Sequence, residues 1–165
     1  MADAIILTNE QINHKIKRIS FQILEENVNE NEIIIAGIAA NGFILAKKIK
    51  TVLEDISNAS IVLCEVIIDK KNPLNEIKTS LKPNEFRGKP LVLVDDVLNS
   101  GTTLIYGIKH FLDVPLKSFK TAVLVNRNHK KYPVKADYKG ISLSTTLQDN
   151  ITVEFNKEEA IAYLD

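Results

Sequence analysis

At the centre of the chain stands the run Leu91-Val-Leu-Val-Asp-Asp-Val-Leu-Asn-Ser-Gly-Thr-Thr-Leu104. Its first four residues are apolar, two of them β-branched, which predicts a parallel strand buried on both faces. Asp95 and Asp96 follow where this strand emerges, and open α/β sheets bind their ligands at that carboxyl edge. The run therefore predicts an α/β fold with a binding site directly after the strand.

The turn after the acids predicts a phosphate site. It leads into an apolar helical pattern over 102–112, so free backbone N–H groups and hydroxyls would point at a ligand above the helix start. A simpler interpretation is that one residue only caps the helix and the acids form a solvated edge. The combination of strand, acids and turn favours a site for a phosphorylated sugar. The residues of the turn are Asn99, Ser100, Gly101, Thr102 and Thr103.

Apolar periodicity alternates between helices and strands along the chain, which is typical of α/β proteins with a mainly parallel sheet. We expect one globular domain over 1–165. Thr8 and Gln11 have capping-box spacing before the first helix, and Asn156 and Glu159 have an N-cap and N3 spacing that predicts a terminal helix. The expected helices cover 9–28, 42–53, 102–112 and 156–164, and the expected strands cover 32–38, 61–68, 91–95, 119–125, 141–143 and 151–155.

The periodic pattern dissolves from Asp69 to Pro90, where prolines and charged residues are frequent. Irregular spans of this length inside compact domains are usually functional or disordered. The segment is predicted to be either an active-site lid or a plain surface excursion.

Composition excludes several classes of protein. Lys plus Arg number 21 and Asp plus Glu number 21, so no global basic field points to nucleic-acid binding. Cys64 is the only cysteine, which excludes a disulfide framework and a cysteine-based metal site. The sequence contains neither G-x-x-x-x-G-K-[ST] nor G-x-G-x-x-G, the phosphate loops of nucleotide-binding folds. Without a signal-like start or an apolar run near ~20 residues, we expect a cytoplasmic protein with no membrane partner.

A second block, from Ala122 to Gly140, is locally basic: Asp137 is its only acid, and its bases are Arg127, Lys130, Lys131, Lys135 and Lys139. A solvated loop is the simplest interpretation of such charge. The block nevertheless begins where a strand ends, beside the expected phosphate site. A planar base could then stack on Tyr138.

The acidic pair and its turn resemble the 5-phosphoribosyl 1-pyrophosphate (PRPP) motif of the type I phosphoribosyltransferases. The resemblance implies an open, twisted, mainly parallel sheet flanked by helices, with a small hood from the chain ends. It also implies that Asp95 and Asp96 hold the ribose hydroxyls and that 99–103 wrap the 5′-phosphate. Mg²⁺ is the implied cofactor, held through the same two acids directly or through the ribose.

The basic block narrows the resemblance to the pyrimidine-operon regulators that are also uracil phosphoribosyltransferases, through Arg127-Asn128-His129, Tyr132-Pro133 and Ala136-Asp137-Tyr138-Lys139-Gly140. By position, Tyr138 and Lys139 would bind the base, with Asn126 and Arg127 as neighbours. The implied pyrophosphate loop consists of Ala39, Ala40, Asn41 and Gly42. It lacks the basic residue that these regulators usually have, so its contacts would come from backbone and amide groups.

The expected function is transfer of the phosphoribosyl group from PRPP to a nucleobase, with uracil favoured and pyrophosphate released. Two alternatives stay open: a nucleotide-responsive, RNA-binding regulator with little or no catalysis, and a purine phosphoribosyltransferase. The resemblance also implies a homo-oligomer, dimeric or larger.

Overall fold

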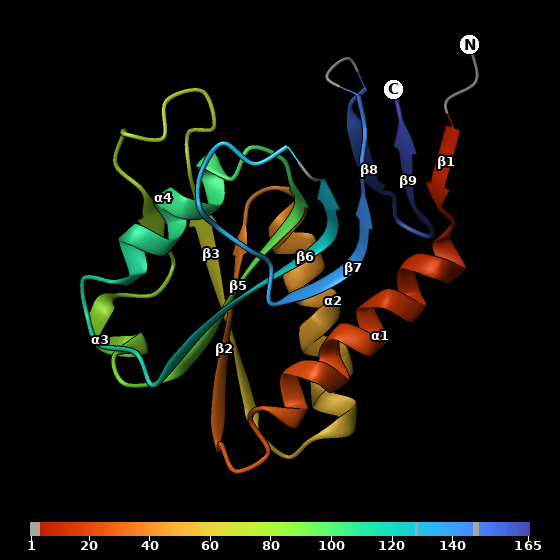
Figure 1. Ribbon diagram of the computed structural model, residues 1–165. Helices are drawn as coiled ribbons and strands as arrows, with labels where there is room; N and C mark the ends of the chain where they lie inside the picture. The colour runs from red at the N-terminus through yellow and green to blue at the C-terminus, as the bar shows by residue number, and fades with distance from the viewer. Residues whose placement is uncertain (1–3, 128, 147–148) are drawn as a thin grey trace.

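The computed structural model describes residues 4–127, 129–146 and 149–165. The main sheet is built from β2 Glu32–Ile38, β3 Ser60–Ile67, β4 Lys78–Thr79, β5 Pro90–Leu98, β6 Ser118–Arg127 and β7 Tyr138–Leu143. The helices are α1 Asn9–Glu25, α2 Asn41–Ile56, α3 Pro83–Phe86 and α4 Thr102–Phe111. The strand order is β4-β3-β2-β5-β6-β7, and every pairing is parallel except that of β3 with β4. The predicted open, mainly parallel sheet flanked by helices is confirmed (Figure 1).

Alternate side chains of the central strands face opposite layers of helices. In β2, Ile33 and Ile35 pack in the core with α1 and α2, whereas Ile34 packs in a second core with α4. Figure 1 shows α1 and α2 on one side of the sheet and α3 and α4 on the other. Burial on both faces explains the continuous apolar runs in the sequence. The polar residues that follow these runs are thereby gathered at the carboxyl edge of the sheet.

A small second sheet, the hood, joins segments from both ends of the chain. It consists of β1 Ala4–Leu7, β9 Ala160–Leu164 and β8 Ile151–Phe155, which pair antiparallel in that order. The Asn9 side-chain oxygen accepts a hydrogen bond from the Ala160 N–H at 2.8 Å, which ties the hood to the start of α1. The structure thus contains the hood that the resemblance implied.

The predicted terminal helix over 156–164 is wrong, because β9 occupies most of this range. Ala160 and Ala162 are buried, which is the two-residue period of a strand rather than a helical period. The Asn156 N–H donates to the Glu159 carbonyl at 2.8 Å and closes the turn between β8 and β9. Asn156 therefore serves a turn instead of a helix cap.

Helix α1 begins as predicted but ends earlier. The Thr8 N–H donates to Gln11 Oε1 at 2.9 Å and the Gln11 N–H donates to Thr8 Oγ1 at 3.3 Å, the two bonds of a capping box. The helix ends at Glu25 rather than Val28, and Asn27 Nδ2 donates to the Ile23 carbonyl at 2.7 Å, which satisfies one of the last helical acceptors. Across the described ranges, no helix combines the length and apolar content needed to span a membrane.

The predicted irregular segment from Asp69 to Pro90 contains more structure than expected. Its second half holds β4, which pairs with β3, and α3, whose Phe86 is buried. Its first half, the 69–77 segment, is an exposed excursion organised around Asp69, whose Oδ1 accepts hydrogen bonds from the Lys71 and Asn72 N–H groups at 3.0 and 3.2 Å. The part of this segment that directly follows β3, residues 69–77, is therefore short and turn-rich.

Candidate functional site

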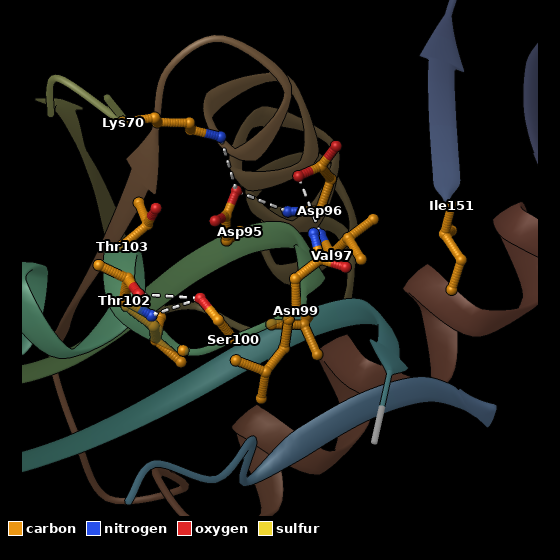
Figure 2. Close-up of a pocket in the computed structure, with 13 residues that line it drawn as sticks. Lys70, Asp95, Asp96, Val97, Asn99, Ser100, Thr102, Thr103 and Ile151 are labelled. Carbon is orange, nitrogen blue, oxygen red and sulfur yellow. Dashed lines mark hydrogen bonds and ion pairs between the residues drawn. The ribbon is translucent and has the colours of Figure 1, made fainter. Parts of the chain in front are cut away.

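A cavity of about 220 Å³ opens at the carboxyl end of β5. All seven residues predicted to bind the ribose and its phosphate, Asp95, Asp96 and the turn 99–103, line it together (Figure 2). The lining is completed by Val97 and Leu98 of β5, Leu104 of α4, Lys70 after β3, Val123 of β6 and Ile151 at the start of β8. The parallel sheet explains this convergence, because it brings the ends of neighbouring strands to one edge.

The two carboxylates of the site differ in environment. Asp95 is only 5% exposed, whereas Asp96 is partly exposed. Asp95 Oδ1 accepts a hydrogen bond from the Asp96 N–H at 2.9 Å, and Asp96 Oδ1 accepts one from the Val97 N–H at 2.9 Å. Burial, reinforced by the charge of Asp96, raises the pKa of Asp95 well above its ordinary value, although Lys70 opposes the shift. Asp95 is thus a carboxylate that favours a bound cation or hydrogen-bond donor.

The raised pKa of Asp95 predicts a pH-dependent gain of stability in Asp95→Asn. The folded state keeps this proton at pH values where the unfolded chain has lost it, so the wild-type free energy of unfolding falls as pH rises from the unfolded pKa through the folded pKa. Asparagine does not titrate. We expect urea midpoints measured from about pH 4 to about pH 8 to show that the stability of the variant relative to that of the wild type increases as pH rises.

Asp55→Asn is the control for this pH series, because Asp55 is exposed on α2. Its difference from the wild type should lack the upward trend with pH. A constant difference for Asp95→Asn across the series would contradict the assigned direction of the shift.

The turn before α4 is shaped to face a ligand. Gly101 has a φ of 87°, in the left-handed region that favours glycine, and a Cβ there would lie 2.5 Å from Val134 Cγ2. The Ser100 and Thr102 hydroxyls are 2.8 Å apart, Ser100 Oγ accepts a hydrogen bond from the Thr102 N–H at 3.3 Å, and the N-cap residue of α4 is Gly101, which has no side chain. Hydroxyl groups, backbone N–H groups and the positive end of the helix dipole therefore point together at the cavity, as a phosphate requires.

The predicted pyrophosphate loop, 39–42, lies at the end of β2 and contacts the acidic pair. A Cβ on Gly42 would lie 2.7 Å from the Val94 carbonyl oxygen and 3.1 Å from Asp95 Oδ1, so glycine allows this close approach. Asn41 Nδ2 donates to Asp96 Oδ2 at 3.0 Å and to the Val153 carbonyl of β8 at 2.8 Å. Asn41 therefore connects the acidic pair to the hood.

Asn41→Ala removes both of these hydrogen bonds, one of them to a carboxylate. We expect a loss of about 1–3 kcal/mol in the free energy of unfolding, read from urea midpoints, because hydrogen bonds to charged groups are worth more than neutral ones. Amide hydrogen exchange in β8 should accelerate as well. Asn58→Ala, at an exposed position before β3, is the matched control and should leave both readouts near the wild type. Equal stability of the two variants would contradict the connecting role.

The predicted base-binding pair Tyr138 and Lys139 does not reach the cavity. Tyr138 pairs with Ala122 in the sheet, is 3% exposed and packs in the core beneath α1, and this burial raises its pKa. Lys139 is exposed, and its carbonyl accepts a hydrogen bond from Arg18 of α1 at 3.1 Å. Strand alternation explains this placement, because Tyr138 faces the α1 side of the sheet whereas the cavity-lining Val123 faces the other.

Asn126 and Arg127 do lie at the carboxyl edge, at the end of β6, but Asn126 is engaged with β7 and Arg127 with the segment after it. Asn126 Nδ2 donates to Ser142 Oγ at 3.2 Å, and its Oδ1 is buried without a partner among the described residues. Arg127 donates to Thr145 Oγ1 and, at 2.8 Å, to the Thr146 carbonyl. These residues anchor the chain that leads into the hood. Asn128, the central residue of the Arg127-Asn128-His129 motif, lies outside the described residues.

Ile151 and Lys70 are two of the cavity residues that were not predicted from the sequence. Ile151 lies at the start of β8 on the far side of the cavity from Lys70 (Figure 2). Its only sequence signal was membership of the expected strand 151–155, whose position in the fold the sequence does not show. Lys70 was one of several basic residues in the irregular segment, and its place beside Asp95 depends on the turn around Asp69.

Comparison with known proteins shows the family of this chain. The chain matches the phosphoribosyl transferase domain family over residues 4–159. It is 34% identical to the bifunctional protein PyrR of Fusobacterium nucleatum over 95% of this chain and 96% of that protein, and 31% identical to the protein of the same name from Bacillus pumilus over 93% and 91%.

Solved structures show the same fold. A hypoxanthine-guanine phosphoribosyltransferase from Bacillus anthracis superposes with a TM-score of 0.76 at 20% identity, covering 99% of both chains. The hypoxanthine phosphoribosyltransferase of Trypanosoma cruzi gives 0.76 at 17% identity, covering 98% of this chain and 97% of that one. Since the family match spans nearly the whole sequence and the fold agrees with it, this chain belongs to the phosphoribosyl transferase domain family.

Proposed function

We propose that this protein transfers the 5-phosphoribosyl group of PRPP to a nucleobase, with uracil favoured, and releases pyrophosphate. The observation that supports it most is the convergence of two acids and a hydroxyl-rich turn at a helix start in one cavity. A sugar phosphate presents a dianion and a vicinal diol about one ribose apart. The turn matches the dianion and the carboxylates match the diol.

In this proposal the turn 99–103 binds the 5′-phosphate, and Asp95 and Asp96 accept hydrogen bonds from the ribose hydroxyls. The residues present also fit Mg²⁺, because two acids line the cavity. That ion keeps several waters and is commonly held by one or two carboxylates together with substrate phosphates. When bound, Mg²⁺ would neutralise part of the pyrophosphate charge.

The chemistry then depends on charge at the sugar. As the C1–O bond to pyrophosphate breaks, positive charge builds on the ribose ring, and the nearby carboxylates stabilise that charge more than they stabilise the ground state. The base nitrogen forms the new bond to C1 and gives up its proton to solvent. Lys70 of the 69–77 segment lies beside Asp95, and closure of this segment over the acids would limit access of water, which competes as a nucleophile.

The base is proposed to lie between β5 and the hood, where Ile151 offers an apolar surface to a planar ring. This replaces Tyr138, which is buried elsewhere. The resemblance to pyrimidine-operon regulators favours uracil. The alternative is a purine phosphoribosyltransferase, which would catalyse the same transfer with a larger base. The hood sets the width of this space and therefore the size of the base that it admits.

The test is pyrophosphate release from PRPP with Mg²⁺, assayed with uracil, hypoxanthine, guanine, adenine, xanthine and orotate in turn. Release that depends on uracil supports the proposal as stated. Release with a purine alone supports the transferase and corrects the base. Absence of release with every base, together with absence of PRPP binding, would contradict the proposal.

A regulator of RNA is the second candidate function. Lys130, Lys131, Lys135 and Lys139 are all exposed, and the relatives described above are called bifunctional. A protein that neutralises several RNA phosphates loses affinity steeply as salt rises. Filter binding of a pyrimidine-operon leader RNA at increasing salt tests this function, and affinity that is absent or insensitive to salt would remove it.

A further inference from the structure

The turn 99–103 rests on residues 129–137, the stretch that leads into β7. The Ser100 carbonyl accepts two backbone hydrogen bonds from this stretch, one from the Lys131 N–H at 2.7 Å and one from the Tyr132 N–H at 3.1 Å. Figure 1 shows the stretch running past the start of α4 before it turns into β7. None of its described residues lines the cavity. The stretch therefore supports the turn from the side that faces away from the ligand position.

Two side chains of the stretch add to this backbone contact. The Tyr132 ring lies edge-to-face against the ring of Tyr106 in α4, with centroids 6.4 Å apart and an interplanar angle of 71°. Val134 packs against the turn itself, where its Cγ2 fills the space that a Cβ on Gly101 would enter. Both the turn and the helix that follows it are therefore held by the same short stretch.

The stretch is in turn fixed to the main sheet. Thr121 of β6 donates from its Oγ1 to the Lys135 carbonyl at 2.6 Å and from its N–H to Asp137 Oδ2 at 2.9 Å. Ala136, between these two contacts, is buried. The hydrogen bonds to Ser100 thus come from a segment that is itself anchored.

The two bonds to the Ser100 carbonyl decide where the next N–H points. The Ser100–Gly101 peptide bond is trans, and in a planar trans peptide the carbonyl and the N–H point in opposite directions. Because the carbonyl is held toward Tyr132, the Gly101 N–H is directed to the opposite side of the turn, where the turn lines the cavity. A phosphate oxygen there would meet a donor that is already oriented, which lowers the cost of binding.

We infer that Tyr132 is a positioning residue for the 5′-phosphate. It touches no ligand itself. Its backbone N–H holds the Ser100 carbonyl on the outer side of the turn, and its ring keeps the stretch against Tyr106 of α4. This inference rests on the proposed function, in which the turn 99–103 binds the phosphate, and adds to it the residue that keeps the Gly101 N–H aimed at that phosphate.

The chain allows the Gly101 amide to be observed alone. Of its six glycines only Gly101 follows a serine, so protein labelled with ¹³C-carbonyl serine and ¹⁵N-glycine gives one signal in an NMR experiment that selects ¹³C–¹⁵N peptide bonds. Titration of the wild type with ribose 5-phosphate should move the Gly101 amide proton downfield, because a hydrogen bond to a charged acceptor is short and strong. A proton that does not move when the protein is saturated would overturn the inference.

Tyr132→Ala removes the ring and changes no charge. We expect ribose 5-phosphate and PRPP, each with Mg²⁺, to bind about tenfold more weakly by titration calorimetry, which is about the value of one hydrogen bond to a charged group. The movement of the Gly101 proton on binding should shrink as well. Tyr132→Phe keeps the ring and should restore both readouts to those of the wild type.

Tyr106→Ala removes the same ring contact from the side of α4. It leaves the 129–137 stretch unaltered, so it tests the inference even if Tyr132→Ala does not fold. Its loss of affinity for ribose 5-phosphate should be similar to that of Tyr132→Ala. The double variant should lose no more than either single variant, because both substitutions break one interaction.

Tyr163→Ala is the matched control, because Tyr163 is another partly exposed tyrosine, in β9 of the hood. It should bind ribose 5-phosphate as the wild type does, with the same movement of the Gly101 proton. Wild-type affinity in both Tyr132→Ala and Tyr106→Ala, a loss in Tyr132→Phe as large as in Tyr132→Ala, or an equal loss in Tyr163→Ala would each overturn the inference alone. A wild type that binds neither PRPP nor ribose 5-phosphate would overturn the proposed function as well.

Discussion

Replacing both Asp95 and Asp96 by asparagine should reduce affinity for PRPP by about 100-fold or more. Each carboxylate is proposed to accept a hydrogen bond from a ribose hydroxyl, and hydrogen bonds to charged groups contribute about 1.5–3 kcal/mol each. Two of them together correspond to roughly two to four powers of ten in affinity. The substitution also removes the negative charge that favours Mg²⁺ and the developing charge on the sugar.

Titration calorimetry with PRPP and Mg²⁺ measures this effect, and the single variants show how the two acids share it. Asp55→Asn, exposed on α2, is the matched control and should bind as the wild type does. The double variant should remain folded, because loss of the buried Asp95 charge removes a cost of folding. A folded double variant with unchanged affinity would refute the assignment of these acids to the ribose.

The largest loss of stability is expected from Phe111→Ala. Phe111 is fully buried at the end of α4, with its ring centroid 5.1 Å from that of Phe86 and 6.0 Å from that of Phe119, both in edge-to-face geometry. Truncation of a buried phenylalanine removes its transfer free energy and leaves a cavity, which costs about 3–5 kcal/mol. The lost ring contacts add to this cost.

Urea denaturation measures the loss, with an unchanged m-value as the sign that only stability has changed. Phe21→Ala is the control, because Phe21 of α1 is 43% exposed and should cost far less. A Phe111→Ala midpoint near that of the control would mean that α4 does not depend on this aromatic cluster.

The sequence predicted best what is encoded locally. Asp95, Asp96 and the turn 99–103 belong to one strand–turn–helix unit, so their relative positions follow from the strand end and the helix start, without knowledge of the rest of the fold. The capping box at Thr8 is equally local, and the structure contains it. Buried runs such as 32–38 were recognisable because a parallel sheet covered on both faces leaves no polar alternation.

Features that depend on distant partners were predicted poorly. The side of the sheet that Tyr138 faces is set by its register with β6, which no local pattern shows. Residues 160–164 form a strand because β1 and β8 lie on either side, although their flanking residues resemble a helix cap. Ile151 reaches the cavity only because the hood folds back over the carboxyl edge. In each case tertiary pairing decided what local preference could not.

The close approach of Gly42 to β5 has a consequence for protein engineering. A basic side chain at position 42 would clash with the Val94 carbonyl oxygen. A basic side chain at position 41 would remove the hydrogen bonds of Asn41 to Asp96 and to the hood. Ala40 is exposed and is the open place for such a side chain. Substitution of Ala40 by a basic residue is therefore the way in which a redesigned sequence could place a second cation beside the acids.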